Sequence, residues 1–275
     1  MIMRNYLNLV LSATLSLVFV SPCNAQTVQR APGMRPLTVD GVWQHNPQTT
    51  NRDALRYHRQ GVNLYDHAKM KDAIAQFNEA IKLEPKVAEF YYRRGDCWIE
   101  LDKLKEAYAD YTKAIELEPN HYPAYKRRAR IDYERGKLED AVKDYDSAAK
   151  RSPNKIERAE IIKLKAKIHS FMNKHDLAIE DLTQAVALNK TAHALMLRGN
   201  SYFSLKQYKK AIDDYTEAIK YKSPKLQERL FSMRADAYEK IGRFDLAKKD
   251  RKDAKSIVDD SWGGVLQDMD KQTKL

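Results

Sequence analysis

The sequence predicts an all-α fold built from repeated pairs of antiparallel helices. Its 275 residues include only nine Gly and nine Pro, and 32% of them are charged. Such a composition favours helices over sheets. Apolar residues recur at helical spacing, and the same pattern returns several times along the chain. Because one helix pair cannot bury its own apolar faces, we expect successive pairs to stack.

Residues 88–121 show this pattern most completely. Apolar residues from Leu104 to Ile115 follow the i, i+3, i+4, i+7 spacing that places one apolar stripe on a helix. The segment 101–103, just before Leu104, has room only for a tight turn between two helices. Pro119 ends the second helix, because a helix interior cannot accommodate the proline ring or its missing N–H. We therefore expect this stretch to form one helical hairpin.

This hairpin resembles the tetratricopeptide repeat, which has a period of about 34 residues. The matching residues are Tyr91, Gly95, Trp98, Ala107, Tyr111, Ala114 and Pro119. One match would mean little, but seven in a single register that recurs along the chain are a strong signal. The resemblance implies an α–α superhelix, that is, a tetratricopeptide solenoid of antiparallel helix pairs, over about three quarters of the chain.

Six repeats can be placed on the sequence. Their ranges are 54–87, 88–121, 122–155, 159–191, 192–225 and 228–261. The fourth is the least regular, because His169 stands at its aromatic position, where we predict a semi-buried residue rather than a metal ligand. In the fifth, the terminal proline, Pro224, stands one position later than the terminal proline of the first three repeats. In the sixth, Arg251 replaces an aromatic residue, as expected where no following repeat covers that face.

The ends of the chain differ from the repeats. Residues 1–25 resemble an export signal, with Arg4 before an apolar run and small residues before a plausible cleavage site. The apolar run is shorter than the roughly 20 residues of a membrane-spanning helix, although an uncleaved membrane anchor remains an alternative. Residues 26–53 are expected to form a flexible linker, and residues 262–275 a C-terminal tail. The predicted location is therefore periplasmic or secreted.

Comparing the repeats with one another indicates a ladder of ion pairs. Repeats two to six carry a basic residue at the seventh position and an aspartate at the twenty-third. The pairs are Arg94 and Asp110, Arg128 and Asp144, Lys165 and Asp181, Arg198 and Asp214, and Arg234 and Asp250. The first repeat has Gln60 and Gln76 there, so acid and base are lost together. We expect structural ion pairs, either within each hairpin or between neighbours.

The resemblance also implies a concave groove lined by the first helices of successive repeats. Transferring the groove positions of the family gives candidate binding residues. They are Tyr92, Arg93, Lys126, Arg127, Arg130, Lys163, Lys167 and Asn200. The basic members form a predicted stripe suited to an acidic peptide or a terminal carboxylate. The alternative is that they are solvated charges on an unused face.

The sequence thus favours a non-enzymatic scaffold or adaptor that binds a protein or an acidic peptide in this groove. It carries no phosphate-binding Gly loop, no HExxH pair and no Cys/His cluster, so we expect no catalytic site, metal, cofactor or small-molecule substrate. A net charge of +11 raises nucleic-acid binding as an alternative, but Asp96 and Glu160 also face the predicted groove. The other alternative is a self-assembling component of the cell envelope. The membrane would be involved only through an uncleaved signal.

Overall fold

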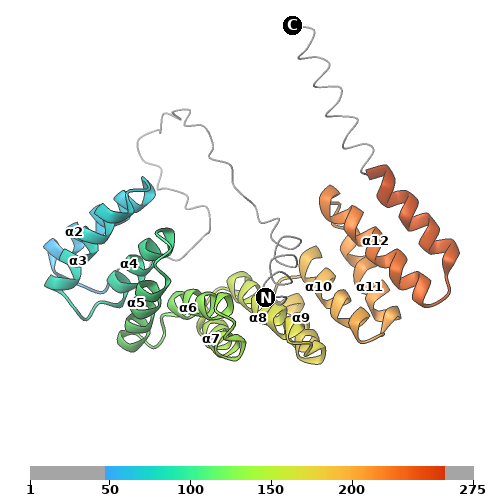
Figure 1. The fold of residues 1–275 in the computed structure, drawn as a ribbon, viewed down its shortest axis with the longest axis horizontal. Coiled ribbons are helices and arrows are strands. Elements are labelled where there is room, and N and C mark those ends of the chain that lie inside the picture. The colour runs from blue at the N-terminus through green and yellow to red at the C-terminus, as the bar shows by residue number, and fades with distance from the viewer. Residues whose placement is uncertain (1–46, 258–275) are drawn as a thin grey trace, which may run out of the picture. The chain divides into compact units, whose positions relative to one another are not determined.

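A computed structural model of the chain describes residues 47–257, all of which belong to one compact unit beginning at residue 45. The signal predicted at 1–25, most of the predicted linker and the tail predicted at 262–275 lie outside the described residues. The described part is helical throughout, and its helices follow one another in sequence order along the array (Figure 1).

The helices pair as six antiparallel hairpins within the described residues. The first helices are α2 Arg52–Asp66, α4 Ala88–Glu100, α6 Tyr122–Glu134, α8 Lys155–Phe171, α10 Ala192–Ser204 and α12 Pro224–Lys240. The second helices are α3 Met70–Leu83, α5 Leu104–Leu117, α7 Leu138–Arg151, α9 His175–Leu188 and α11 Tyr208–Ile219, followed by the helical residues 244–257. Each helix packs on the next in sequence, and α2 also contacts α4, as α8 contacts α10.

The turn inside each hairpin passes through one residue in the left-handed region. These residues are Ala68, Asp102, Gly136, Asn173, Lys206 and Gly242. A left-handed residue after a helix lets the following N–H groups reach the last carbonyls, as in the bond from Lys103 N to Trp98 O of 2.8 Å. The turn geometry therefore repeats even where the residue type does not.

Small residues let the two helices of a hairpin approach closely. A Cβ placed on Gly95 would lie 2.7 Å from the ring of Tyr111, and one on Gly199 would lie 2.6 Å from the ring of Tyr215. Neither distance is tolerable, so the aromatic ring of the second helix fits only because the first helix has no side chain there.

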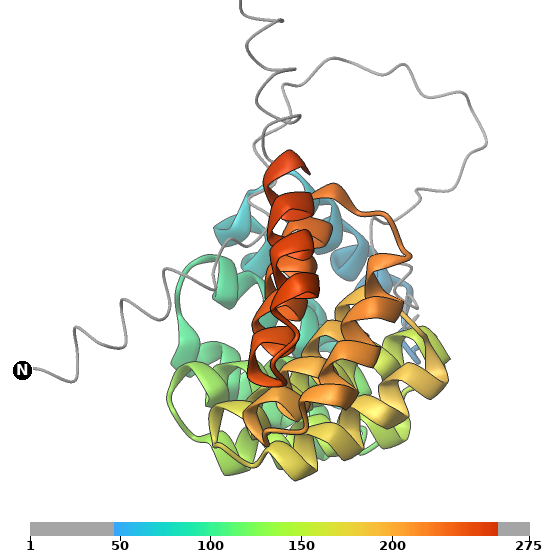
Figure 2. The ribbon, with the colours of Figure 1, turned by 90° about the vertical axis from the view of Figure 1, so that its right-hand side faces the viewer.

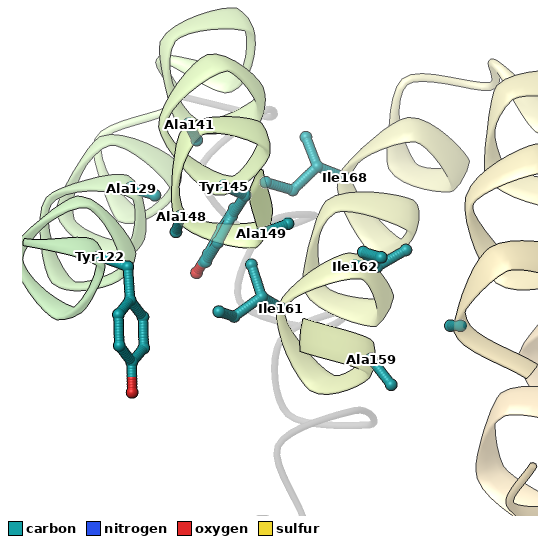
Figure 3. Packing of buried hydrophobic residues seen from close by; sticks show 11 residues of the cluster. Tyr122, Ala129, Ala141, Tyr145, Ala148, Ala149, Ala159, Ile161, Ile162 and Ile168 are labelled. Carbon is teal, nitrogen blue, oxygen red and sulfur yellow. The ribbon is translucent and has the colours of Figure 1, made fainter. Parts of the chain in front are cut away.

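The core continues from one hairpin to the next instead of closing within each. In the cluster shown in Figure 3, Tyr145 and Ala149 of α7 face Ile161 and Ile168 of α8, across the boundary between repeats three and four. Figure 2, in which the C-terminal hairpin is nearest the viewer, shows successive hairpins as neighbouring layers. Stability therefore depends on contacts between neighbours, as in other repeat arrays.

Two predicted boundaries were wrong. Pro224 is the first residue of α12 and does not end the fifth repeat, because α11 already ends at Ile219. A proline is well accommodated at the first helical position, where its missing N–H would have no partner in any case. The predicted linker also ends early, since α2 begins at Arg52, capped by the side chain of Asn51. No helix of the described residues is both long and apolar enough to cross a membrane.

Candidate functional site

Four arginines of the predicted ladder each bind the aspartate of their own hairpin. Arg94 donates from Nε and Nη2 to the two carboxylate oxygens of Asp110, over 2.8 and 2.7 Å. The same two-pronged contact joins three further pairs. They are Arg128 with Asp144, Arg198 with Asp214, and Arg234 with Asp250. The aspartates are buried, so each guanidinium fork satisfies two oxygens that water cannot reach.

The third nitrogen of each arginine reaches back to the preceding repeat. Nη1 of Arg94 donates to Asn78, and the equivalent atoms of Arg128, Arg198 and Arg234 donate to threonines. The acceptors are Asn78 at 2.7 Å, Thr112 at 3.2 Å, Thr183 at 3.3 Å and Thr216 at 2.9 Å. Each arginine therefore joins the two helices of its own hairpin and also joins that hairpin to the one before it. The threonines recur at the twenty-fifth position, a repeat-to-repeat pattern that the sequence analysis missed.

The fourth repeat makes the same connection with different residues. Lys165 lies 2.8 Å from Asp181 Oδ1, and His169 Nδ1 lies 2.8 Å from Asp181 Oδ2. Since one lysine nitrogen cannot span both oxygens, His169 supplies the second contact. Lys165 also reaches back 3.3 Å to Asp146, which takes the place of the threonine in the preceding repeat. His169 is therefore a buried part of the ladder.

The candidate binding residues lie on the face formed by α4, α6, α8, α10 and α12, which we call the first-helix face. At its α4–α6 part, buried acids hold the basic groups. Arg93 Nε donates to Glu89 over 2.6 Å, and Arg127 Nε lies 3.1 Å from Asp96 on the neighbouring helix. The acids are only 4% and 7% exposed, whereas the Arg93 and Arg127 side chains are 26% and 37% exposed. The acids are thus structural, and the two arginine side chains are partly exposed.

A buried polar network lies beneath these arginines. The Tyr111 hydroxyl donates to Asp96 over 2.8 Å, and His121 Nε2 lies 3.2 Å from the second oxygen of Glu89. Burial alone would raise the pKa of Glu89, but the hydrogen bond with His121 and the charge of Arg93 lower it below 4.5. Tyr92, predicted as a binding residue, is itself buried against the rings of Tyr111 and His121. It therefore serves the packing between repeats.

On α6, the two other predicted basic residues are also paired. Lys126 Nζ lies 2.5 Å from Glu157, which belongs to the neighbouring helix α8. Arg130 lies 2.9 Å from Glu134, one turn further along its own helix, and both of these side chains are exposed. Exposed pairs of this kind contribute little to stability. Arg130 is the most exposed of the paired candidate binding residues.

The face of α8, α10 and α12 is different. Lys163 lies 2.7 Å from Glu160, but Lys167 has no ion pair or hydrogen bond with the described residues. Asn200 accepts a hydrogen bond of 2.8 Å from the Tyr215 hydroxyl. The sequence did not single out His193 and Arg229. The charges of Lys167, Lys163 and Arg229 lower the pKa of His193, after burial, which lowers it most. No group of three or more potential metal ligands occurs within residues 47–257.

Comparison with known proteins identifies the repeats. One model of the tetratricopeptide repeat family matches residues 88–121 and 192–223, and a second model of the family matches residues 159–191. The chain contains tetratricopeptide repeats. The matched ranges begin at α4, at α10 and within α8, so each tetratricopeptide unit is one of the hairpins described above. No curated protein matches the chain.

Solved structures of other tetratricopeptide proteins share this fold. The MamA structure is 24% identical, with a TM-score of 0.56 over 62% of this chain and 96% of that one. YrrB, a tetratricopeptide protein with an unusual peptide-binding site, is 18% identical, with a TM-score of 0.58 over 66% of this chain and 91% of that one. The C-terminal part of a repeat protein from Cytophaga hutchinsonii is 20% identical, with a TM-score of 0.63 over 74% of this chain and 80% of that one. The array is thus a fold of the protein-interaction scaffold type.

Proposed function

We propose that the chain is a scaffold or adaptor that holds a partner protein by binding an extended polypeptide segment along its first-helix face. The observation that carries this proposal is the arrangement of Arg93 and Arg127. Their side chains are partly exposed on two neighbouring helices, and the buried acids Glu89 and Asp96 lie beside them as ion-pair partners. A polypeptide that lies across α4 and α6 can contact both arginines at once.

Fixed guanidinium groups suit the recognition of a polypeptide. Each has five N–H donors, and within the described residues the hydrogen bonding of Arg93 uses only Nε. The remaining donors can bind backbone carbonyls or carboxylates of a partner. Because the side chains are already held, binding sacrifices little side-chain entropy.

We also propose that the protein works outside the cytoplasm, in the periplasm or as a secreted protein. This rests on the resemblance of residues 1–25 to an export signal, together with the presence of a single cysteine, Cys97, beyond that segment. A lone cysteine forms no internal disulfide, so the fold does not rely on one in an oxidising compartment.

Site-specific photo-crosslinking tests the binding face. A photoreactive residue at Arg130, on the first-helix face, should capture a discrete partner in intact cells. The same residue at Lys143, exposed on the second helix of the same repeat, is the matched control and should capture little. Equal capture from both positions would contradict the proposal. Binding to an acidic peptide and to an oligonucleotide should be titrated with salt in parallel, since tighter and more salt-dependent oligonucleotide binding would favour a nucleic-acid partner.

A further inference from the structure

The C-terminal part of the first-helix face contains positive charges without acidic partners. Lys167 on α8 and Arg229 on α12 are both exposed, and neither forms an ion pair or hydrogen bond within residues 47–257. The nearby acid Glu160 is already paired with Lys163. These charges are therefore available to a ligand without breaking any contact of the protein.

His193 on α10 reports the positive potential of this region. Its pKa is lowered to about 4, first by burial and then by the charges of Lys167 and Lys163, with Arg229 adding to the effect and Glu160 opposing it. Basic side chains of α8 and α12 therefore both act on His193, which lies on the helix between them in sequence order. An anionic group placed among them would be attracted by Lys167 and Arg229 together.

Beside this charged region lies an exposed aromatic pair. The rings of Tyr133 on α6 and Phe171 on α8 meet edge to face, with centroids 6.5 Å apart. Tyr133 is 40% exposed and Phe171 is 55% exposed. Aromatic rings that contact each other yet remain open to solvent offer an apolar surface, to which a third ring can add.

The spacing of the two features suggests the shape of a ligand. Lys167 and Phe171 stand one helical turn apart on the same side of α8, a rise of about 6 Å along the axis. In an extended peptide, side chains two residues apart point the same way and lie about 6.8 Å apart. A carboxylate and an aromatic side chain at positions i and i+2 of a peptide therefore match Lys167 and Phe171.

We propose that this region, which we call the Lys167–Phe171 site, binds a partner segment with an acidic and an aromatic residue two positions apart. The carboxylate pairs with Lys167 and is attracted by Arg229, while the aromatic ring packs on Phe171 and Tyr133. This inference rests on the proposed binding of polypeptides along the first-helix face and specifies the chemistry of the bound segment.

Short synthetic peptides test the site on the full chain. Fluorescein-labelled probes carry Glu-Ser-Phe or Phe-Ser-Glu in a Gly/Ser background, with Gln in place of Glu and Ala in place of Phe as matched probes. By fluorescence anisotropy, the Glu/Phe probe in its preferred order should bind about fivefold more tightly than either matched probe, equivalent to about 1 kcal/mol for each contact. Equal affinities in both orders would overturn the inference.

Protein variants assign the contacts. The double variant Lys167→Ala plus Arg229→Ala should abolish the preference for Glu over Gln and keep the preference for Phe, whereas Phe171→Ala should do the reverse. Lys105→Ala plus Lys209→Ala removes two exposed charges from second helices and should change neither preference. Circular dichroism checks that every variant is folded. If the Glu preference survives the first double variant, the site is wrong.

The test also separates this inference from the proposed function. If probes bind, and the Glu preference is lost in Arg93→Gln but retained in Lys167→Ala plus Arg229→Ala, polypeptides bind along the first-helix face at another place. The proposed function then stands and the Lys167–Phe171 site fails. If neither these probes nor a random-sequence peptide pool binds, and photo-crosslinking captures no partner, the proposed function fails as well.

Discussion

The first-helix face has two parts that carry similar charges in different ways. Over α4 and α6, every basic candidate binding residue has an acidic partner, and two of those partners are buried. Over α8, α10 and α12, Lys167 and Arg229 are exposed and have no acidic partner within the described residues. Charges paired with buried acids stabilise the stack and keep only their remaining donors for a ligand, whereas charges without acidic partners are wholly available for binding. Charge counts from sequence cannot make this distinction.

The largest expected effect follows from removing a paired base. Arg127→Ala leaves the buried Asp96 carboxylate with the Tyr111 hydroxyl as its hydrogen-bond donor. We expect a loss of about 2–4 kcal/mol in the free energy of unfolding, allowing for the partial exposure of Arg127. Urea denaturation would measure this loss. A loss below about 1 kcal/mol would show that the pair is not structural, and adding Asp96→Asn should recover part of the stability.

The second prediction concerns the pH dependence of the α4–α6 part. Because the pKa of Glu89 is lower in the folded protein than 4.5, its ionised form stabilises the fold above that pH, and this stabilisation is lost as the pH falls through the folded value. Glu89→Gln should therefore cost about 2 kcal/mol at neutral pH. The difference from the unsubstituted protein should shrink below about pH 4.5. Unfolding curves at several pH values would show this, and a constant difference would contradict it.

A third, smaller effect tests whether pairing matters more than location. Arg198 lies on α10, in the repeat between those that carry the unpaired charges, but it binds Asp214 through two nitrogens and Thr183 through the third. Arg198→Lys keeps the charge and loses the fork, so we expect a loss of about 1 kcal/mol. No effect on thermal unfolding would mean that the two-pronged geometry is irrelevant to stability.

The smallest effect is expected where the charges have no partners. Lys167→Ala plus Arg229→Ala should change the free energy of unfolding by less than about 0.5 kcal/mol, as is usual for exposed residues away from structural contacts. A loss as large as that of Arg127→Ala would remove the contrast between the two parts of the face.

Much of the architecture could be predicted from sequence, because the period and the small residues at close-packing positions are visible in it. The acid–base ladder was visible as a covariation between repeats, including its absence at Gln60 and Gln76. The contact of each arginine with the preceding repeat depends on side-chain directions across a packed interface, so spacing alone did not give it. Likewise, Phe171 stands outside the transferred groove positions, and only the fold brings it against Tyr133.

The prediction of where the fifth repeat ends was wrong for a local reason. The sequence predicts Pro224 as the end of the fifth repeat, because prolines follow the second helices at Pro85, Pro119 and Pro153. In those turns the proline comes two residues after the helix, whereas Pro224 occupies the first position of α12. Both placements suit a residue without an N–H, so a proline alone does not show whether one helix has ended or the next has begun.

The most direct test of the contrast is the ratio of the dissociation constants for the Gln and Glu probe peptides, measured in two variants. In Lys167→Ala plus Arg229→Ala we predict that the ratio falls to about 1. In Arg198→Lys, which alters a base paired with Asp214, we predict that it stays at about 5. A ratio that falls in Arg198→Lys and persists in the double variant would contradict the assignment of binding to the unpaired charges.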